Sequence, residues 1–521
     1  MSSRGSTDRA AGDRVIVVGA GLAGTAAAVR LAAAGVPVTL VDANRHVGGK
    51  MNVWEQSGYR FDMGPTIITM PGVLERLFES AGRRMSHYLD LRRLDPQWRC
   101  SYADGAVLDL WQDPQKMRAE IERLSPADAR QYEAFLRYSR EMFDISDEFF
   151  FWRSWGGISD VFKEYGIGSL DGLRMGSRIH PFTSFHSAVR RHFTDPRLVQ
   201  LFDHFTQYVG SSPFMAPAIL TLIAWAQIDL GVWYPMGGTG SIARALHRLA
   251  VELGVDLRLG QGVERISIEG GRVSGVVLEG GETLPARAVV SNRDVIRTYR
   301  DLIPHPKAAQ FLRRERRRLE PACSGVVLYL GCNRTWESLR HHVFMFSKDP
   351  DDEFHRIYER GEPAPDMTVY LAAPSLTDPS MAPEGHTSLY ALVHTPYRRD
   401  TANWEEIAPR YREAILDRME ERGLEGLRES IQVSRMLTPR DIEQLYASER
   451  GSIYGLLTRR GLTAAFKPGN RCREFPGLYF AGGSVNPGAG VPMVLMSGQV
   501  AADCVLADLG GSHSAALPSA A

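Results

Sequence analysis

The chain has 521 residues, which is too long for one compact core of ordinary size, so two sequential or intertwined domains are expected. Hydrophobic residues make up 44% and charged residues 23% of the sequence, as is typical of a globular protein. The 61 Lys and Arg residues balance the 61 Asp and Glu residues, so no global field attracts nucleic acid, and a neutral partner or substrate fits better.

The chain opens with the pattern of a strand, a helix and a second strand. Residues Met1–Arg14 are polar and lack the apolar core of a signal peptide, and the five cysteines are scattered without a CxxC pair or metal-ligand cluster. Both features favour a reducing, cytoplasmic compartment. The apolar runs 15–18 and 38–41 predict buried parallel strands, and the Ala-rich segment 25–34 between them predicts a helix.

The segment 114–233 has a helical and aromatic pattern. Its most apolar part, Pro213–Trp233, is interrupted by Gln227 and Asp229, so the uninterrupted apolar run is too short to span a bilayer. We predict a helix there that is either buried or membrane-facing, with burial favoured.

Strands and helices alternate through the rest of the chain. The predicted helices are 237–253, 404–422 and 492–509, and the predicted strands are 263–268, 272–278, 288–291, 326–330, 388–394 and 478–481. The strands at 326–330 and 388–394 are assigned to a sheet of their own. We therefore expect two interleaved domains, the first built from 1–90, 235–300 and 470–521 and the second from 91–234 and 301–469.

A dinucleotide fingerprint of the form G-x-G-x-x-G joins the first strand to the first helix, and Asp42 ends the next strand eighteen residues later. Its glycines permit the tight turn, leave room for a pyrophosphate and let the helix approach the sheet. The helix N-terminus attracts phosphate, while Asp42 can hold a ribose and disfavours a 2′-phosphate. The predicted cofactor contacts are Gly19, Ala20, Gly21, Leu22, Ala23, Gly24 and Asp42.

The match continues beyond the second strand. Gly48-Gly49-Lys50 follows Asp42, and this longer pattern resembles the FAD-binding signature of the flavin-containing amine oxidase and carotenoid desaturase superfamily. The resemblance implies that FAD is the cofactor, with Gly49 and Lys50 near its phosphates or flavin. A solvated loop position is the alternative for Lys50.

Three further segments resemble the bacterial-type phytoene desaturases of this superfamily, namely Phe61–Thr66, Tyr234–Gly240 and Gly477–Pro492. The glycines of the last segment would let backbone approach a flat ring, and the helix after it would direct its N-terminus at the flavin's pyrimidine edge. Asn486 stands where many family members carry His, so we assign no proton-transfer role there. The implied contacts are Gly64, Pro65, Thr66, Val263, Gly482, Gly483, Gly490, Val491 and Pro492.

The resemblance implies an α/β fold, in which a Rossmann-like FAD-binding domain of the glutathione-reductase or amine-oxidase type is interleaved with a mixed α+β substrate domain. The implied activity is FAD-dependent desaturation of a linear polyprenoid such as phytoene or diapophytoene, with hydride transfer from an allylic carbon to the bound flavin. Because one dinucleotide fingerprint is found and not two, we expect a quinone or oxygen as the electron acceptor. No catalytic base is readable.

Alternatives from the same superfamily also act on polyprenoids: a carotenoid isomerase, a saturase, a terminal oxidase or a 3,4-desaturase of hydroxylated carotenoids. A non-enzymatic prenyl-binding escort protein is a further alternative, although the intact fingerprint argues against it. Because the implied substrate lives in bilayers, we expect peripheral membrane association. The aromatic run Phe149–Trp155 and the segment Pro213–Trp233 are the candidate contacts, with ordinary core packing as the alternative for each aromatic residue.

Overall fold

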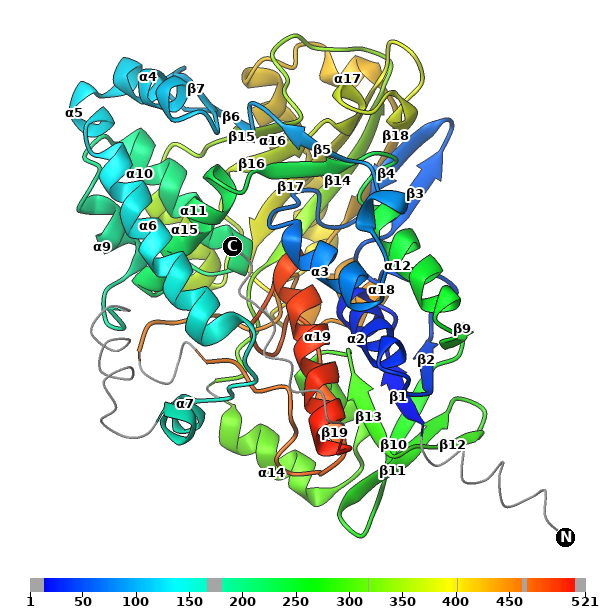
Figure 1. The fold of residues 1–521 in the computed structure, drawn as a ribbon. Helices are drawn as coiled ribbons and strands as arrows, with labels where there is room; N and C mark the ends of the chain where they lie inside the picture. Colours follow the sequence, from blue (N-terminus) through cyan, green and yellow to red (C-terminus); the bar gives the residue numbers. More distant parts are fainter. Residues whose placement is uncertain (1–13, 166–179, 317, 401, 462–465, 511–521) are drawn as a thin grey trace, which may run out of the picture.

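The computed structural model describes residues 14–165, 180–316, 318–400, 402–461 and 466–510. The sequence predictions for residues 1–13 and 511–521 therefore lie outside the described residues. Two large sheets organise the described chain, a parallel sheet in the lower right of Figure 1 and a mostly antiparallel one in the upper half. The expected α/β fold is confirmed.

The parallel sheet has the strand order β19-β13-β1-β2-β9, and every neighbouring pair is parallel. The first strand is apolar and buried throughout because both faces of the sheet are covered. The sheet extends from β1 through β2 and β9 on one side and through β13 and β19 on the other. The carboxyl end of β1 is therefore the topological switch point where ligands bind in such sheets. The strands are β1 (Val15–Val18), β2 (Val38–Asp42), β9 (Asp256–Leu259), β13 (Ala288–Ser291) and β19 (Leu478–Phe480).

The sheet draws strands from all three chain segments that were assigned to the first domain. The domain boundaries themselves stay a prediction. A smaller antiparallel sheet adjoins it, and in this sheet the predicted strands 263–268 and 272–278 form a hairpin around Gly270-Gly271. Its strands are β10 (Val263–Glu269), β11 (Arg272–Leu278) and β12 (Thr283–Pro285).

Two helices, α2 (Leu22–Ala33) and α19 (Val491–Asp508), pack against each other over the parallel sheet (Figure 1). Their backbones approach closely, because a Cβ atom added at Gly498 would lie 2.2 Å from the carbonyl oxygen of Ala23. In the described part of the chain α19 is the one helix long and apolar enough to cross a membrane, but 72% of it is buried, as in a core helix. A third helix, α12 (Gly240–Glu252), also contacts α2.

The apolar segment Pro213–Trp233 is folded into the protein, as the favoured alternative predicted. It forms a 3-10 turn, η4 (Ala218–Thr221), then α11 (Leu222–Ile228) and the start of β8 (Val232–Pro235). The short helix packs against α6 (Tyr132–Ser146), and most of its residues are buried.

The upper sheet has the strand order β18-β14-β17-β16-β15-β6-β7. It contains the two strands predicted around 326–330 and 388–394, both longer than expected and buried throughout. The side chains of β17 alternate between an aliphatic core on one face and an aromatic core on the other. The strands are β6 (Trp98–Ser101), β7 (Val107–Leu110), β14 (Ser324–Cys332), β15 (His342–Met345), β16 (Val369–Ala372), β17 (Thr387–Thr395) and β18 (Ile431–Leu437).

Helices cover this sheet on both sides. The aliphatic face is covered by α16 (Trp404–Glu421), which was predicted from its amphipathic pattern. On the left of Figure 1 lie α4 (Pro114–Leu124), α5 (Pro126–Ala129), α6, α9 (Phe185–Arg190), α10 (Pro196–Asp203) and α11. The other elements used below are β3 (Val53–Gln56), β4 (Tyr59–Asp62), α3 (Gly72–Ser80), β5 (Leu91–Leu94), the π-helix η2 (Asp147–Phe151), α13 (Val295–Arg297), α14 (Pro306–Glu315) and α18 (Pro439–Tyr446).

Candidate cofactor and substrate site

The loop Gly19–Gly24 leaves β1 at the switch point of the parallel sheet. Gly19 has a φ of +100°, a conformation that costs glycine little and other residues much. Helix α2 begins at Leu22, three residues earlier than the Ala-rich pattern suggested, so Gly24 lies in its first turn. No described side chain caps this helix, which leaves its first N–H groups available for a phosphate.

Asn292 joins the fingerprint to the C-terminal motif. A Cβ atom added at Gly21 would lie 2.7 Å from its Oδ1, and one added at Gly482 would lie 2.8 Å from its Nδ2. The same Nδ2 donates a hydrogen bond to the Ala481 carbonyl at 3.0 Å. Asn292 was not predicted from the sequence, although its place directly after β13 at the carboxyl edge of a parallel sheet is a usable signal.

Asp42 is held in position at the end of β2. Its Oδ2 accepts a hydrogen bond from the Ala20 N–H at 2.6 Å, and its Oδ1 accepts one from the Asn44 N–H at 2.7 Å. Its backbone carbonyl accepts the Gln261 N–H at 2.9 Å, which brings Val263 to the same edge of the sheet. The predicted ribose acid and Val263, an implied cofactor contact, therefore lie near each other.

Lys50 directs its ammonium group into the protein, not into solvent. Gly49, before it, lies against Gly21, since an added Cβ atom would come 3.3 Å from the Gly21 Cα. The Lys50 Nζ donates to the carbonyls of Ser452 and Ile453, both at 3.1 Å. Burial lowers the Lys50 pKa to about 8, and the nearby Asp294 carboxylate opposes this shift.

A second buried lysine was missed from the sequence. Lys467 donates a hydrogen bond from Nζ to the Leu456 carbonyl, and a Cβ atom added at Gly488 would lie 3.0 Å from its Cε. Burial lowers its pKa to about 8 as well, again opposed by Asp294. Lys50 therefore holds Ser452 and Ile453 to the loop after β2, and Lys467 holds Leu456 beside the C-terminal motif. An isolated lysine outside any motif gave no sequence signal for this role.

The segment Phe61–Thr66 lies between the loop that carries Lys50 and strand β16 of the upper sheet. A Cβ atom added at Gly64 would lie 2.0 Å from the Lys50 carbonyl oxygen, so Gly64 and the adjoining Pro65 lie beside that loop. The Thr66 hydroxyl is 2.5 Å from the Tyr370 hydroxyl on β16.

Asp62 fastens the second glycine segment, Tyr234–Gly240, to the same place. It is 2% exposed, and its Oδ1 accepts the Gly240 N–H at 3.2 Å where α12 begins. Burial raises the pKa of this carboxyl group, and the hydrogen bonds from Thr239 and Gly240 oppose the shift.

The C-terminal motif places the N-terminus of α19 at the site. Gly490 has a φ of +107° and precedes Val491 and Pro492, the first residues of the helix, which no described side chain caps. The Gly482 N–H donates to Ser497 Oγ at 3.0 Å, so the strand end and the helix are fixed to each other. Asn486 donates from Nδ2 to the Arg153 carbonyl, which gives this departure from the family pattern a structural use.

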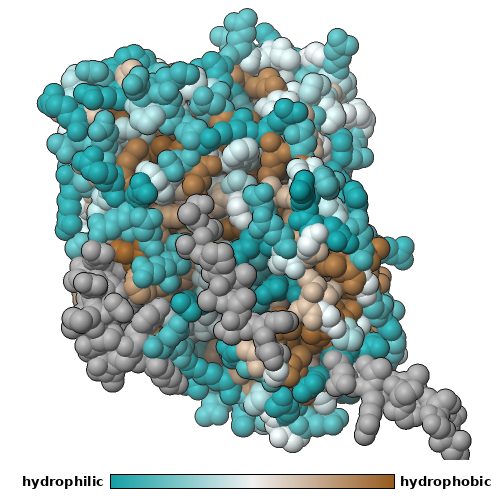
Figure 2. Space-filling view, in the orientation of Figure 1, coloured by the Kyte–Doolittle hydropathy of each residue, from teal (hydrophilic) through white to brown (hydrophobic). Residues whose placement is uncertain are grey.

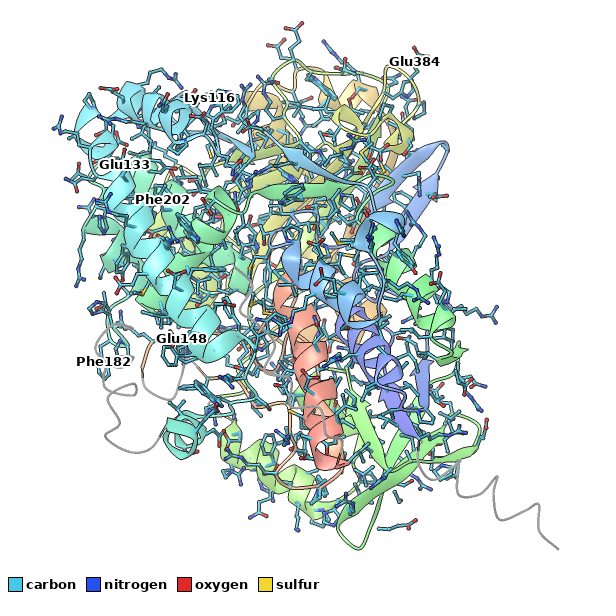
Figure 3. The ribbon with its side chains drawn as sticks, viewed as in Figure 1. Lys116, Glu133, Glu148, Phe182, Phe202 and Glu384 are labelled. Carbon is cyan, nitrogen blue, oxygen red and sulfur yellow. The ribbon has the colours of Figure 1, made fainter. Side chains whose placement is uncertain are left out.

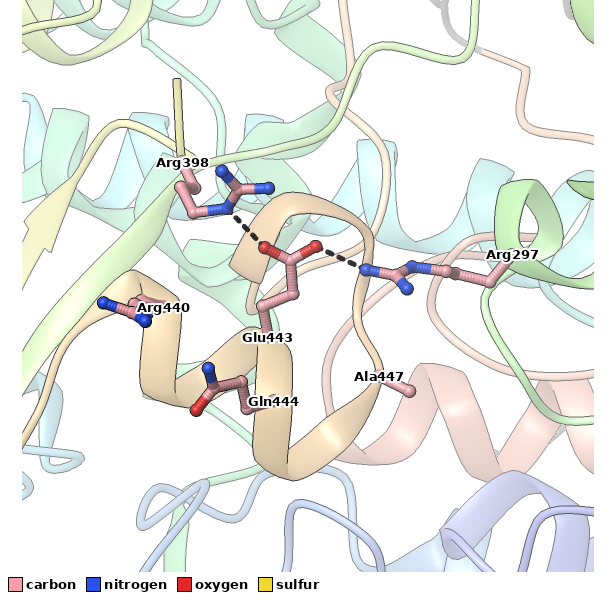
Figure 4. Close-up of a pocket in the computed structure, with 6 residues that line it drawn as sticks. All are labelled: Arg297, Arg398, Arg440, Glu443, Gln444 and Ala447. Carbon is pink, nitrogen blue, oxygen red and sulfur yellow. Dashed lines mark hydrogen bonds and ion pairs between the residues drawn. The ribbon is translucent and has the colours of Figure 1, made fainter. Parts of the chain in front are cut away.

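A surface pocket of about 440 Å³ opens beside α18 (Figure 4). Glu443 accepts hydrogen bonds there from Arg398 Nε, at 2.5 Å, and from Arg297. This charged lining does not suit the apolar substrate expected from the sequence. The lining residues are Arg297, Arg398, Arg440, Glu443, Gln444 and Ala447.

The arrangement fits FAD. The uncapped N-terminus of α2 and the glycine turn before it suit a pyrophosphate, Asp42 suits a ribose, and the uncapped N-terminus of α19 suits a flavin edge. When bound, FAD supplies the redox chemistry, and the chain binds and orients it. Fold and site together define a flavoprotein with a Rossmann-like cofactor domain.

The chain belongs to the family of flavin-containing amine oxidoreductases, whose family model matches residues 22–506. It is 40% identical over 497 residues to a 4,4'-diapolycopene oxygenase of Methylomonas, covering 95% of this chain and 98% of the relative. It is 38% identical to a 4,4'-diaponeurosporene oxygenase of Staphylococcus haemolyticus, covering 94% and 96% of the two chains. These matches confirm the resemblance seen in the motifs.

Solved structures confirm the fold. An oxidoreductase from Methanosarcina mazei matches with a TM-score of 0.64 and 17% identity, covering 95% of this chain and all of the other. Cyclohexylamine oxidase from Brevibacterium oxydans matches with a TM-score of 0.60 and 17% identity, covering 95% and 99%. The protein is an FAD-dependent oxidoreductase, as expected from its sequence.

Proposed function

We propose that the protein is an FAD-dependent oxygenase that oxidises the end of a linear polyprenoid carotenoid. The observation that carries this proposal is the 40% identity, over nearly the whole of both chains, to an enzyme named 4,4'-diapolycopene oxygenase. It favours the terminal oxidase, one of the alternatives open from the sequence, over the desaturase that the motifs first suggested. Desaturation of the same class of polyprenoid is the second candidate, supported by those motifs.

The aromatic core on one face of the upper sheet is suited to a long apolar substrate. One face of the upper sheet carries a large cluster of aromatic side chains, several of them in ring contact. The Trp98 ring lies 5.0 Å from that of Phe205 and 4.3 Å from that of Phe344, measured between centroids. A conjugated chain is favoured by such surroundings because it is apolar and polarisable.

The stoichiometry of methyl oxidation agrees with a single dinucleotide fingerprint. Conversion of a terminal methyl group to an aldehyde by one molecule of O2 yields one molecule of water, so atoms and electrons balance without an external reductant. Desaturation instead releases two electrons and two protons for each double bond and requires an acceptor. Of the two acceptors considered from the sequence, oxygen therefore fits the proposed reaction.

The test uses the purified holoenzyme in liposomes that contain either diapolycopene or diapophytoene, under isotopically labelled O2. We expect diapolycopene to lose two hydrogens and gain one labelled oxygen, as measured by mass spectrometry. Products that lose hydrogen pairs without gaining oxygen would show a desaturase instead. A protein that holds polyprenoid but no flavin would support the escort alternative.

Peripheral binding to the cytoplasmic face of a membrane forms part of the proposal, because a carotenoid substrate is dissolved in the bilayer. Among the described residues, Phe182 is the most exposed large apolar side chain, at 71%. Figure 3 shows it at the edge of the molecule, on the same side as Glu133 and Glu148 of the α6–η2 region. Of the run Phe149–Trp152, Phe151 is buried and its neighbours are partly buried, so Phe182 joins this run as a candidate contact.

A further inference from the structure

Residues 452–456 carry a tyrosine to the edge of the cofactor site. A Cβ atom added at Gly455 would lie 2.6 Å from the carbonyl oxygen of Gly483 in the C-terminal motif. On the other side, Lys50 binds the carbonyls of Ser452 and Ile453. Tyr454 lies between these two attachments, so its backbone is fixed beside the residues that suit the flavin.

The Tyr454 ring is also fixed. A Cβ atom at Gly210 would lie 2.7 Å from its Cδ2, so the ring packs directly on that backbone. The ring stacks on His394 with centroids 5.9 Å apart, and its hydroxyl is 3.4 Å from His394 Nε2. This long contact is the one hydrogen bond that the Tyr454 hydroxyl makes with a described residue, so further hydrogen-bonding capacity remains.

Strand β17 contributes a second phenol, that of Tyr390, from the same face of the strand as His394. Tyr390, Leu392 and His394 share one face because alternate residues of a strand point the same way. The Tyr390 side chain is only 7% exposed, and no described residue forms a hydrogen bond with its hydroxyl. The Tyr390 hydroxyl therefore keeps its full capacity to donate and accept a hydrogen bond with a polar group supplied from outside the described chain.

The hydroxyl groups of two neighbouring tyrosines already have hydrogen-bond partners within the protein. The Tyr370 hydroxyl lies 2.5 Å from Thr66 Oγ1 and 2.9 Å from His342 Nδ1. The Tyr208 hydroxyl donates to Gln227 Oε1. Tyr454 and Tyr390 therefore keep capacity for a further polar partner within the tyrosine cluster, which we define as Tyr208, Tyr370, Tyr390 and Tyr454.

The cluster also limits the charge of that partner. Burial raises the pKa of Tyr454 and Tyr390, and the proximity of the two phenols adds to the shift at Tyr454. Burial lowers the pKa of His394 to about 4, so its imidazole is neutral at pH 7. Neutral phenols and a neutral imidazole suit an uncharged oxygen, such as an alcohol or aldehyde, and offer no countercharge to a carboxylate.

We propose that the hydroxyls of Tyr454 and Tyr390 bind the oxygen atom of a substrate whose end already carries a hydroxyl or carbonyl group. This inference rests on the proposed function and extends it, because it makes an end-oxidised polyene a preferred ligand of the same site. An enzyme with this preference retains the product of its first oxidation and completes further oxidation before release. His394 is a positioning residue that orients the Tyr454 hydroxyl.

The test measures binding and product distribution separately. Quenching of tryptophan fluorescence gives the affinity for a hydrocarbon polyene and for the same polyene with a terminal alcohol or aldehyde. Trp98 is a suitable reporter, since its ring stacks on Tyr208 of the cluster at 6.0 Å. We expect Tyr454→Phe and Tyr390→Phe each to weaken binding of the oxidised polyene roughly tenfold, the loss of about one hydrogen bond, with the hydrocarbon unchanged.

Tyr329→Phe is the matched control. Tyr329 belongs to the same aromatic core, with its ring 5.6 Å from that of Tyr390, but its hydroxyl is bonded to the Met63 carbonyl at 2.8 Å. Tyr329→Phe should leave the ratio of the affinities for the oxidised and the hydrocarbon polyene unchanged. The double variant Tyr454→Phe/Tyr390→Phe should release more of the terminal alcohol during turnover than wild type.

Two outcomes separate this inference from the proposed function. If wild-type protein forms no oxygenated product but prefers the oxidised polyene, and the tyrosine variants lose this preference, the proposed function fails and the inference stands. Equal affinity of wild type for both polyenes, with no change in either variant, would overturn the inference while leaving the oxygenase activity open to its own test.

Discussion

Single side chains join parts of the cofactor site that lie far apart in the sequence. Asn292 lies between Gly21 and Gly482, Asp62 binds the start of α12, and Lys50 holds the segment after Ser452. None of these links is a local interaction, so no spacing pattern could predict them. The glycines at these contacts could be predicted, because a glycine in a fingerprint indicates where other atoms approach the backbone.

The fingerprint prediction is tested by Gly21→Val. The new side chain would meet Asn292 Oδ1 and displace the glycine turn before α2, where a pyrophosphate is expected. We expect the folded protein to lose its flavin absorbance, since overpacking of about 1–3 kcal/mol weakens binding by roughly fivefold to more than a hundredfold. Gly72→Val is the control, because no atom lies within 4 Å of a Cβ atom at Gly72. Full flavin content in folded Gly21→Val would contradict the assignment.

The two buried lysines predict opposite pH effects on stability and on cofactor retention. Their pKa values are lowered from 10.5 to about 8, so between these values the unfolded chain binds more protons than the folded one. The stability of apoprotein, relative to a Lys50→Met/Lys467→Met variant, should therefore rise with pH in this window. FAD retention should fall over the same window, because loss of the ammonium charges weakens attraction for the anionic cofactor.

Melting temperatures of both apoproteins and flavin content after gel filtration, each measured from pH 7 to about 10.5, check this pair of effects. A constant difference in melting temperature between wild type and the variant would show that the lysines do not titrate in this range. Flavin retention that is equally pH-dependent in both proteins would show that other groups control cofactor binding.

Helices and strands could be predicted from the sequence where all their residues share one environment, such as complete burial. The parallel strands β1, β2 and β13 are short β-branched runs buried on both faces, and their predicted bounds differ from the observed ones by at most one residue. The start of α2 was predicted too late because the Ala-rich pattern begins after Gly24, whereas the helix already begins after Gly21. The strands β6, β7 and β15, at one end of the upper sheet, have only four residues each and were missed, because pairing with distant strands determines them.

The contact between α2 and α19 positions the N-termini of both helices, which are the expected contacts to the pyrophosphate and to the flavin edge. Gly498→Val would press a side chain against the Ala23 carbonyl and separate the helices, so both uncapped N-termini would shift. We expect the free energy of unfolding to fall by about 1–3 kcal/mol, with partial loss of FAD. Thermal unfolding monitored by circular dichroism and flavin fluorescence measures both effects.

Ala507→Val on the exposed side of α19 is the control, and it should change neither stability nor flavin content. If Gly498→Val retains wild-type stability and cofactor, the two helices can separate without cost, and their close contact does not position the site.

The whole molecule has a neutral charge balance, with 61 basic and 61 acidic residues. Figure 2 shows one face that is largely hydrophilic and is interrupted by separate apolar areas. With 61 basic and 61 acidic residues, attraction to anionic lipid gives little net gain, so binding to a bilayer has to come from inserted apolar side chains. The sequence predicted this mode of binding but could not select the side chains, because adjacent aromatic residues divide between core and surface.

The aromatic run illustrates that division. In η2, Phe151 is 5% exposed within the core, and the Trp152 ring lies 3.9 Å from the Arg76 guanidinium carbon. Both contacts hold the run against the protein. Phe182 is 71% exposed and has no comparable cover from the described residues, so it should contribute more to membrane binding than Phe150 or Trp152.

We therefore predict that the protein floats with liposomes to a similar extent at low and high salt, and that Phe182→Ser reduces flotation with full retention of FAD. The double variant Phe150→Ser/Trp152→Ser should reduce it less. Val251→Ser, at a 54% exposed apolar position on α12, should float like wild type. Unchanged flotation of Phe182→Ser would assign the contact to another surface. If wild type remains unbound at both salt concentrations, peripheral membrane association itself is wrong, and the substrate has to be delivered by a soluble carrier.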